Sequence, residues 1–350
     1  MGSSSSKKYK SNSKKGRIYL QLHAPFCYTG DTFHGTVYFV IEKPYNVESL
    51  NLILTGTEKN SWPKSKDFQN EEKVRFLEQT EVMRRFDTIV QPGHFEMPFS
   101  FGLHSTMPCS FEYENKKEKS RAFIKYAVTA ILKPKSGKEL RFKHKLIVRQ
   151  APPQDIQDNI TKTEEDLVSA CCCSKGSTKM EAILEKSVYL LSSEMKLLLK
   201  ISNRECSVGI KSITAELIQR LILRDSSSQM KITENVHSSS TMPLKLCCFT
   251  NQMDFISLTL AQSEKDLQMQ PSASSMLISC NYIVRIGLNY SSRFIKKQGP
   301  WVIIPVILMT GEQEFERLNP PQEWNPVIYD TYQAQIEANP PNQLNLPIFQ

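Results

Sequence analysis

Apolar side chains recur at every second position along most of this chain. A spacing of two residues places them on one side of a strand, because successive side chains of an extended backbone point to opposite faces. The apolar members of five such segments are Val37, Phe39 and Ile41; Leu50, Leu52 and Leu54; Ile124, Tyr126, Val128 and Ala130; Phe142, Leu146 and Val148; and Met195, Leu197, Leu199 and Ile201. Alternating strands joined by polar turns are typical of antiparallel β-sandwiches, so the sequence predicts an all-β fold.

The length and one break in the pattern predict two domains. The chain has 350 residues, which exceeds the usual size of a single hydrophobic core. Alternation stops at Gln150, and Pro152-Pro153 cannot continue a strand ladder because proline lacks the N–H donor. The predicted segments are a basic N-terminal segment over 1–17, a sandwich over 18–150, a linker with a cysteine cluster over 151–178, a second sandwich over 179–311 and a proline-rich acidic tail over 312–350.

Glycines punctuate the first predicted sandwich. Gly30, Gly35, Gly56 and Gly93 lie between or beside the alternating segments. We expect them at turns that need a positive φ, a conformation that glycine adopts without steric strain.

The spacing of these glycines with nearby aromatic residues and prolines carries a family resemblance. Segments 28–35, 54–62 and 93–113 resemble the N-terminal domain of the arrestin-fold adaptors, specifically the α-arrestin (arrestin-domain-containing) branch. Segments 188–203, 207–219, 281–288 and 302–307 resemble the C-terminal domain of the same family.

The resemblance implies both fold and function. The implied fold is two tandem arrestin-type antiparallel β-sandwich domains, each immunoglobulin-like. The implied function is a non-catalytic adaptor that binds membrane-protein cargo or receptor tails and links them to endocytic and endosomal trafficking and to ubiquitination machinery. A retromer-type coat subunit in endosomal sorting has the same double sandwich and is the alternative.

The N-terminus matches a lipidation pattern. Met1-Gly2 is followed by serine at position 6, which fits N-myristoylation of Gly2. Basic residues follow at once, and one acyl chain with a polybasic patch suffices for stable anchoring to an anionic membrane. The predicted membrane-binding residues are Lys7, Lys8, Lys10, Lys14 and Lys15. We therefore expect a cytoplasmic protein at the periphery of the plasma membrane and endosomes, the alternative being a plain disordered terminus.

A second basic block, over 116–149, suggests an anion-binding surface. Arrestin-like proteins use basic surfaces of the N-terminal domain to bind acidic or phosphorylated cytoplasmic tails of membrane proteins, and ammonium and guanidinium groups suit that role. The candidate cargo-binding residues are Arg141, Lys143, Lys145 and Arg149. The alternative is a solvated strand face. We do not predict nucleic-acid binding, because no helix-turn-helix or zinc-finger spacing is present.

The nine cysteines do not form a spaced disulfide framework. Their odd number and the adjacent Cys171, Cys172 and Cys173 favour a reducing compartment. These three are candidate palmitoylation sites, and the alternative is a strand that begins with small thiols. No C-x-x-C pair or paired histidines are present, so no metal site and no cofactor are predicted.

The tail and the absence of catalytic motifs complete the prediction. The acidic residues of 312–350 suggest that the tail docks on the basic first sandwich. Pro320-Pro321 and Pro340-Pro341 lack the tyrosine of a PPxY motif, so no motif in the sequence directly indicates recruitment of a ubiquitin ligase or of endosomal coat components.

No nucleophile elbow, P-loop or zinc-protease motif is present, and the sequence predicts no enzyme.

Overall fold

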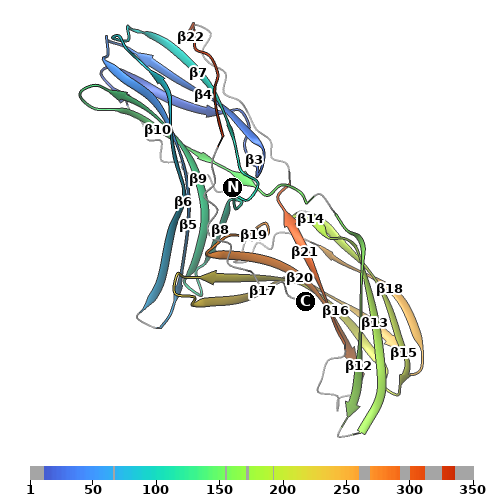
Figure 1. Cartoon of the computed structure of the whole chain (residues 1–350). Helices are drawn as coiled ribbons and strands as arrows, with labels where there is room; N and C mark the ends of the chain where they lie inside the picture. Colours follow the sequence, from blue (N-terminus) through green and yellow to red (C-terminus); the bar gives the residue numbers. More distant parts are fainter. Residues whose placement is uncertain are drawn as a thin grey trace.

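The computed structural model describes residues 12–65, 68–153, 156–170, 173–191, 193–259, 269–291, 300–311 and 325–335. Strands dominate the described residues, which contain no helix, and they form two β-sandwiches joined end to end (Figure 1). We call the sandwich of residues 12–149 the N-domain and that of residues 158–309 the C-domain. The predicted all-β tandem-sandwich fold is confirmed.

The N-domain packs two mainly antiparallel sheets face to face. The first sheet has the spatial order β1 (Asn12–Ser13), β2 (Gly16–Leu22), β4 (Thr32–Ile41) and β7 (Gly93–Gly102). The second has the order β10 (Leu140–Leu146), β9 (Ser120–Pro134), β5 (Val47–Pro63) and β6 (Gln69–Arg85), with β8 (Phe111–Asn115) also paired to β9. Two short strands, β3 (Cys27–Tyr28) and β11 (Val148–Arg149), pair in parallel near the C-domain.

The C-domain has the same two-layer plan. One sheet has the order β12 (Asp158–Ala170), β13 (Cys173–Lys186), β15 (Glu194–Cys206) and β18 (Asn251–Thr259). The other has the order β14 (Val188–Leu190), β21 (Trp301–Met309), β20 (Ile278–Tyr290), β16 (Ile210–Arg224) and β17 (Met230–Leu246), with β19 (Ala273–Ser274) beside β20.

The alternating residues fill the space between the sheets, as predicted. In β4 and β5 the side chains of Val37, Phe39, Leu50 and Leu52 are at most 1% exposed. The same holds for Met195, Leu197 and Leu199 in the C-domain. Burial of these apolar faces is the main force that holds each pair of sheets together.

The predicted linker over 151–178 is shorter in the structure. Strands β12 and β13 together occupy most of it, and they pair with each other along the length of β12. The alternation that marks other strands is absent because β12 ends its sheet and most of its side chains on both faces are exposed. Such a strand needs few apolar residues, so its composition is that of a linker.

The glycines serve two different purposes. Gly30 lies in a turn with φ of 87°, as predicted. The expectation of positive φ is wrong for Gly93, which begins β7, and for Gly35 and Gly56, which lie inside β4 and β5. There a Cβ atom would stand 2.4 Å from the ring of Phe99 and 2.5 Å from the ring of Phe76, respectively. These glycines admit an aromatic ring against the backbone.

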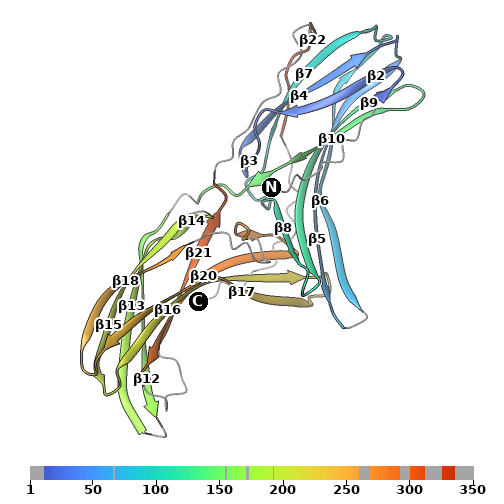
Figure 2. The ribbon, with the colours of Figure 1, turned by 180° about the vertical axis from the view of Figure 1, so that it is seen from behind.

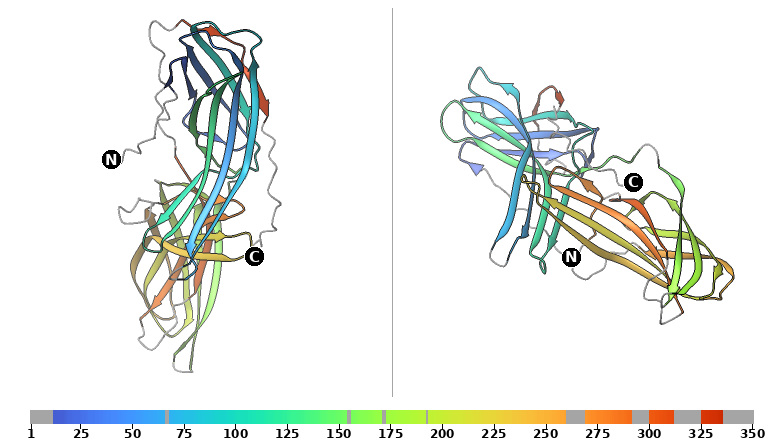
Figure 3. Two further views of the ribbon diagram at one scale, coloured as in Figure 1. Left: turned by 90° about the vertical axis from the view of Figure 1, so that its left-hand side faces the viewer. Right: turned by 60° about the horizontal axis from the view of Figure 1, so that its bottom comes forward.

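Two arrangements position the candidate sites. The long strands β5 and β6 extend beyond the N-domain sandwich to the ends of β16 and β17, which Figure 2 shows from behind. The tail strands β22 (Val327–Ile328) and β23 (Tyr332–Gln335) return to the N-domain and pair in parallel with β7 (Figure 3).

Candidate functional site

Strand β10 presents cationic side chains at every second position. Arg141, Lys143 and Lys145 are exposed, whereas Leu140 and Leu146 are buried in the core. Strand β10 ends its sheet, with β9 on one side, and it lies close to β2 of the other sheet, where the rings of Phe142 and Tyr19 are 4.7 Å apart. Arg141 forms an ion pair with Glu139 at 2.8 Å. In the described part of the chain, Lys143 and Lys145 form no ion pair, so their charges face solvent.

Arg149 lies apart from these three residues. Its guanidinium stands 3.5 Å from the ring centroid of Phe26 and donates a hydrogen bond to the backbone oxygen of Gly311 at 2.7 Å. Burial lowers the pKa of this guanidinium below its usual value. The predicted set of four is therefore not one surface, because Arg149 joins the end of the N-domain to the end of the C-domain.

A pocket of about 360 Å³ lies between the two domains. The N-domain contributes Lys125, Lys145 and Cys109, and the C-domain contributes Ser272 and Met309. Burial raises the pKa of the Cys109 thiol to about 11, so it is protonated at neutral pH and is not a thiolate nucleophile.

The carboxyl of Glu112 lines this pocket beside Lys125 and Lys145. Lys125 donates to it at 2.9 Å. Burial alone would raise the pKa of Glu112, but the bond from Lys125 and the charges of Lys125, Lys145 and Arg121 bring it below its usual value. Glu112 therefore offsets part of the positive charge beside β10.

Two buried polar residues of β5 join the domains, and we call Glu58 and Asn60 the interdomain latch. The Asn60 amide donates to the backbone oxygens of Arg224 at 2.6 Å and Leu277 at 3.0 Å. The Glu58 carboxyl accepts from the Ser275 hydroxyl at 2.6 Å and from the backbone N–H of Leu277 at 3.2 Å. Leu277 is thus held at both its N–H and its C=O by the other domain.

The sequence prediction missed this latch, although a signal was present. Glu58 and Asn60 are 1% and 0% exposed, and they continue the buried phase of Leu50, Leu52 and Leu54 along β5. A carboxyl and an amide at core positions need partners, since unpaired buried polar groups are costly.

The latch predicts a pH dependence of stability. Burial raises the pKa of Glu58, although the bonds from Ser275 and Leu277 act in the opposite direction. A raised pKa in the folded state means that Glu58 stabilises fully below its unfolded value of about 4.5 and loses this contribution as pH rises through the folded value. We expect Glu58→Gln, which stays neutral and can accept the same bonds, to remove this loss of stability. Urea unfolding of both chains between pH 4 and 8 measures it, and an unchanged pH slope in the variant would contradict the assignment.

Residues 325–335, which we call the tail strap, cover the outer edge of β7. The backbone N–H of Tyr329 donates to the oxygen of Glu96 at 2.9 Å, and Tyr332 lies opposite Phe99. The ring of Tyr329 stacks on Phe95 with centroids 6.2 Å apart. The tail therefore docks on the N-domain, but through backbone bonds and aromatic rings, while the acidic Asp330 is exposed.

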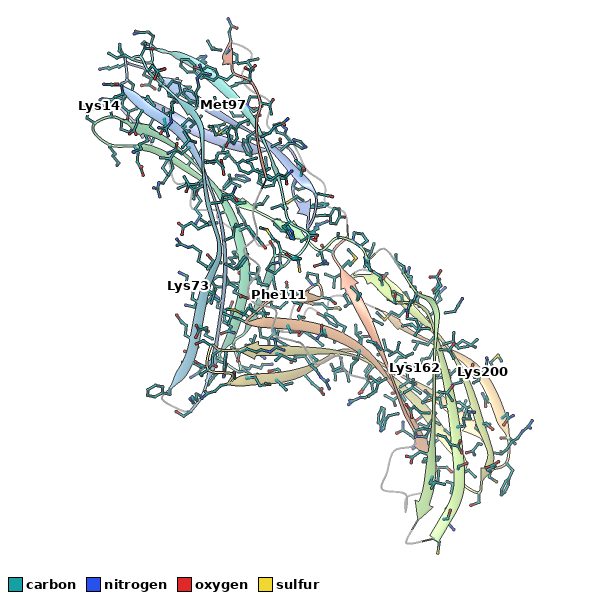
Figure 4. All side chains as sticks on the ribbon, viewed as in Figure 1. Lys14, Lys73, Met97, Phe111, Lys162 and Lys200 are labelled. Atoms are coloured by element: carbon teal, nitrogen blue, oxygen red, sulfur yellow. The ribbon has the colours of Figure 1, made fainter. Side chains whose placement is uncertain are left out.

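The structure describes only some of the predicted lipidation and membrane-binding residues. Gly2, Lys7, Lys8, Lys10, Cys171 and Cys172 fall outside the described residues. Lys14 and Lys15 are exposed in the turn before β2, and Figure 4 places Lys14 at the end of the N-domain far from the C-domain. Cys173 is exposed at the start of β13.

Two absences hold for the residues that the structure describes. They contain no cluster of three or more histidine, cysteine, aspartate or glutamate side chains fit to hold a metal ion. No helix among them is long and apolar enough to cross a membrane.

Comparison with known proteins identifies the family. Residues 16–151 match the family model of the arrestin (or S-antigen) N-terminal domain, and residues 174–313 match that of the C-terminal domain. Arrestin domain-containing protein A of Dictyostelium discoideum is 21% identical in an alignment of 210 residues that covers 54% of this chain and 35% of that protein. The chain thus aligns with about a third of the length of this relative.

The tandem sandwiches and these matches define an arrestin-fold protein. The chain belongs to the arrestin-domain-containing family, and this family suggests the role of an arrestin-like adaptor.

Proposed function

We propose that this chain is a non-catalytic adaptor that binds acidic or phosphorylated cytoplasmic tails of membrane proteins along β10. The observation that carries the proposal is the row of Arg141, Lys143 and Lys145 on a strand at the end of a sheet. Alternate side chains of a strand are about 7 Å apart, and an extended peptide beside β10 has the same repeat. Phosphates or carboxylates at every second peptide position would each meet one cation.

The test compares two labelled peptides that differ only in phosphorylation. Each carries three serines at alternate positions, which are phosphorylated in one peptide and free in the other. Titrated with the full chain at low ionic strength, the phosphorylated peptide should bind at least tenfold more tightly, and added salt should weaken it because exposed charges are screened. Equal affinities would contradict the proposal.

We further propose that the adaptor links its cargo to endocytic and endosomal trafficking and to ubiquitination machinery. The family membership supports this role. Because the tail has no PPxY motif, contact with a ubiquitin ligase or with endosomal coat components would use other surfaces of the chain.

The proposed location is the cytoplasmic face of the plasma membrane and endosomes. Gly2 would carry a myristoyl chain, and Lys7, Lys8, Lys10, Lys14 and Lys15 would contact anionic lipid. The exposure of Lys14 and Lys15 at one end of the N-domain supports this arrangement. Candidate palmitoylation of Cys171, Cys172 and Cys173 would add a second contact, and the exposed Cys173 is accessible to it.

Membrane binding by the N-terminus gives a second prediction. The protein is expressed in cells and then floated with vesicles that contain phosphatidylserine. Gly2→Ala should lower the vesicle-bound fraction of the protein at least about tenfold, because the acyl chain and the basic residues act together. The same variant should bind the phosphorylated peptide unchanged. Equal flotation of variant and parent, or a parent mass without the acyl increment, would contradict acylation.

A further inference from the structure

The tail strap holds two tyrosines three residues apart in opposite electrostatic surroundings. The Arg84 guanidinium carbon lies 4.0 Å from the ring centroid of Tyr329. Tyr332 instead packs against Phe101, with centroids 6.2 Å apart, and its hydroxyl donates to the Glu81 carboxylate at 2.5 Å. One tyrosine therefore faces a cation and the other an anion.

Among the described residues, no recorded contact pairs Tyr332 with a cation. The other carboxylate oxygen of Glu81 already accepts from the Gln79 amide at 2.9 Å, and that same amide bonds the backbone oxygen of Gln335 at 3.0 Å. Asp330, two residues before Tyr332, adds a second carboxylate on the strap. Burial and Glu81 raise the pKa of Tyr332 to about 12, so the phenol is a neutral donor at physiological pH.

The attachment of the strap depends on few groups. Its strands β22 and β23 are two and four residues long and pair only with β7 among the described residues. The two tyrosine rings supply its aromatic contacts to Phe95, Phe86 and Phe101. A segment held in this way opens at low free energy, which would present Tyr332 in extended form to an enzyme.

We propose that Tyr332 is a phosphorylation site and that its modification releases the tail strap from β7. A protein tyrosine kinase would transfer the γ-phosphoryl group of ATP to the phenol oxygen, the phenol proton would pass to the base of the kinase, and ADP would leave. The product loses the donor to Glu81 and places nearly two negative charges beside that carboxylate. Released, the strap uncovers the backbone edge of β7 for an extended segment of another protein.

The same chemistry at Tyr329 has the opposite expectation. A phosphate there would lie near the Arg84 guanidinium, which favours charge-assisted pairing. The chain phosphorylated at Tyr329 is therefore a matched control for the chain phosphorylated at Tyr332, because both carry one phosphate on the same short segment. This proposal is independent of peptide binding at β10, since β7 and β10 belong to different sheets.

The test is amide hydrogen exchange in the full chain. Expressed protein ligation joins a synthetic tail peptide, with phosphotyrosine at a single position, to the rest of the chain. Phosphate at Tyr332 should speed exchange in residues 93–102 and 325–335 about tenfold or more. Phosphate at Tyr329 should leave exchange there unchanged or slower. Exchange in the chain phosphorylated at Tyr332 that is as slow as in the unmodified chain would overturn the proposal.

A charge reversal separates electrostatic release from simple crowding. In the Glu81→Lys chain, phosphate at Tyr332 should pair with the new ammonium and slow exchange in 93–102 relative to the unphosphorylated variant. If phosphate at Tyr332 releases the strap as much in this variant as in the parent chain, repulsion by Glu81 is not the cause of release. Treatment of the full chain with a broad-specificity tyrosine kinase and ATP should label Tyr332, and a Tyr332 that stays unlabelled while Tyr329 is labelled would reject it as a kinase site.

Discussion

Replacing Asn60 with leucine is expected to destabilise the docking of the two domains by about 1–3 kcal/mol. The substitution removes the donor to the backbone oxygens of Arg224 and Leu277. The Leu277 oxygen still accepts from the backbone N–H of Arg224 at 2.9 Å, whereas the Arg224 oxygen loses the amide and faces an apolar side chain. A buried acceptor that loses its partner carries a desolvation penalty of about 1–3 kcal/mol. The loss should appear as an early urea transition and as a larger radius of gyration in solution scattering.

The control for this prediction is Asn51→Leu on the same strand. Asn51 is half-buried within the N-domain, and its side-chain oxygen has no hydrogen-bond partner among the described residues. The control should therefore lose less than about 1 kcal/mol. A loss of equal size in both variants would mean that Asn60 stabilises β5 itself and not the contact with the C-domain.

Reversing two charges on β10 is expected to abolish most of the affinity for acidic tails. Lys143→Glu with Lys145→Glu turns two attractive contacts into repulsive ones, at about 1 kcal/mol each for exposed pairs, which together weaken binding about 30-fold at low salt. The fold should survive, because both side chains are exposed and make no ion pair in the described part of the chain. Fluorescence anisotropy with the phosphorylated peptide measures the change.

Net charge alone must be separated from the position of the charges. Lys162→Glu with Lys196→Glu makes the same change in net charge on exposed residues of the C-domain. This control should keep the affinity of the parent within about threefold. If both double variants lose affinity equally, the effect comes from the overall charge and β10 is not the site.

Periodicity predicted the architecture because it reports burial directly. Phe39 and Leu52 lie in the core because each belongs to a strand with one buried face. The resulting alternation of apolar and polar residues can be detected in one sequence without an alignment. The pattern failed at β12, where an edge strand exposed on both faces has no apolar period to detect. It also assigned Gly35 and Gly56 to turns, because a glycine that admits the ring of Phe99 or Phe76 looks the same in sequence as one that needs a positive φ.

The candidate sites were predictable only where they are local. The exposed phase of Arg141, Lys143 and Lys145 follows from strand alternation within β10. The interdomain latch joins Asn60 to Leu277, more than 200 positions later in the chain. The buried phase of Asn60 indicates that its amide needs a partner, but no local pattern identifies Leu277 as that partner. Arg149 was placed with the cargo cations by its charge, whereas its neighbours Phe26 and Gly311 hold it between the domains.

The docking of the tail shows the same limit. Its acidic composition suggested attraction to lysines, but the tail strap binds β7 through the rings of Tyr329 and Tyr332 and through backbone bonds. Charge can be counted in a sequence, whereas the register of an added strand depends on which sheet edge is open in the folded chain.

Hydrogen exchange of the full chain with and without the triply phosphorylated peptide tests the proposed adaptor role most directly. A peptide bound along β10 should slow exchange in residues 140–146 and leave exchange in the C-domain strand of residues 194–206 unchanged. Unchanged exchange in 140–146 together with protection confined to the C-domain would contradict it.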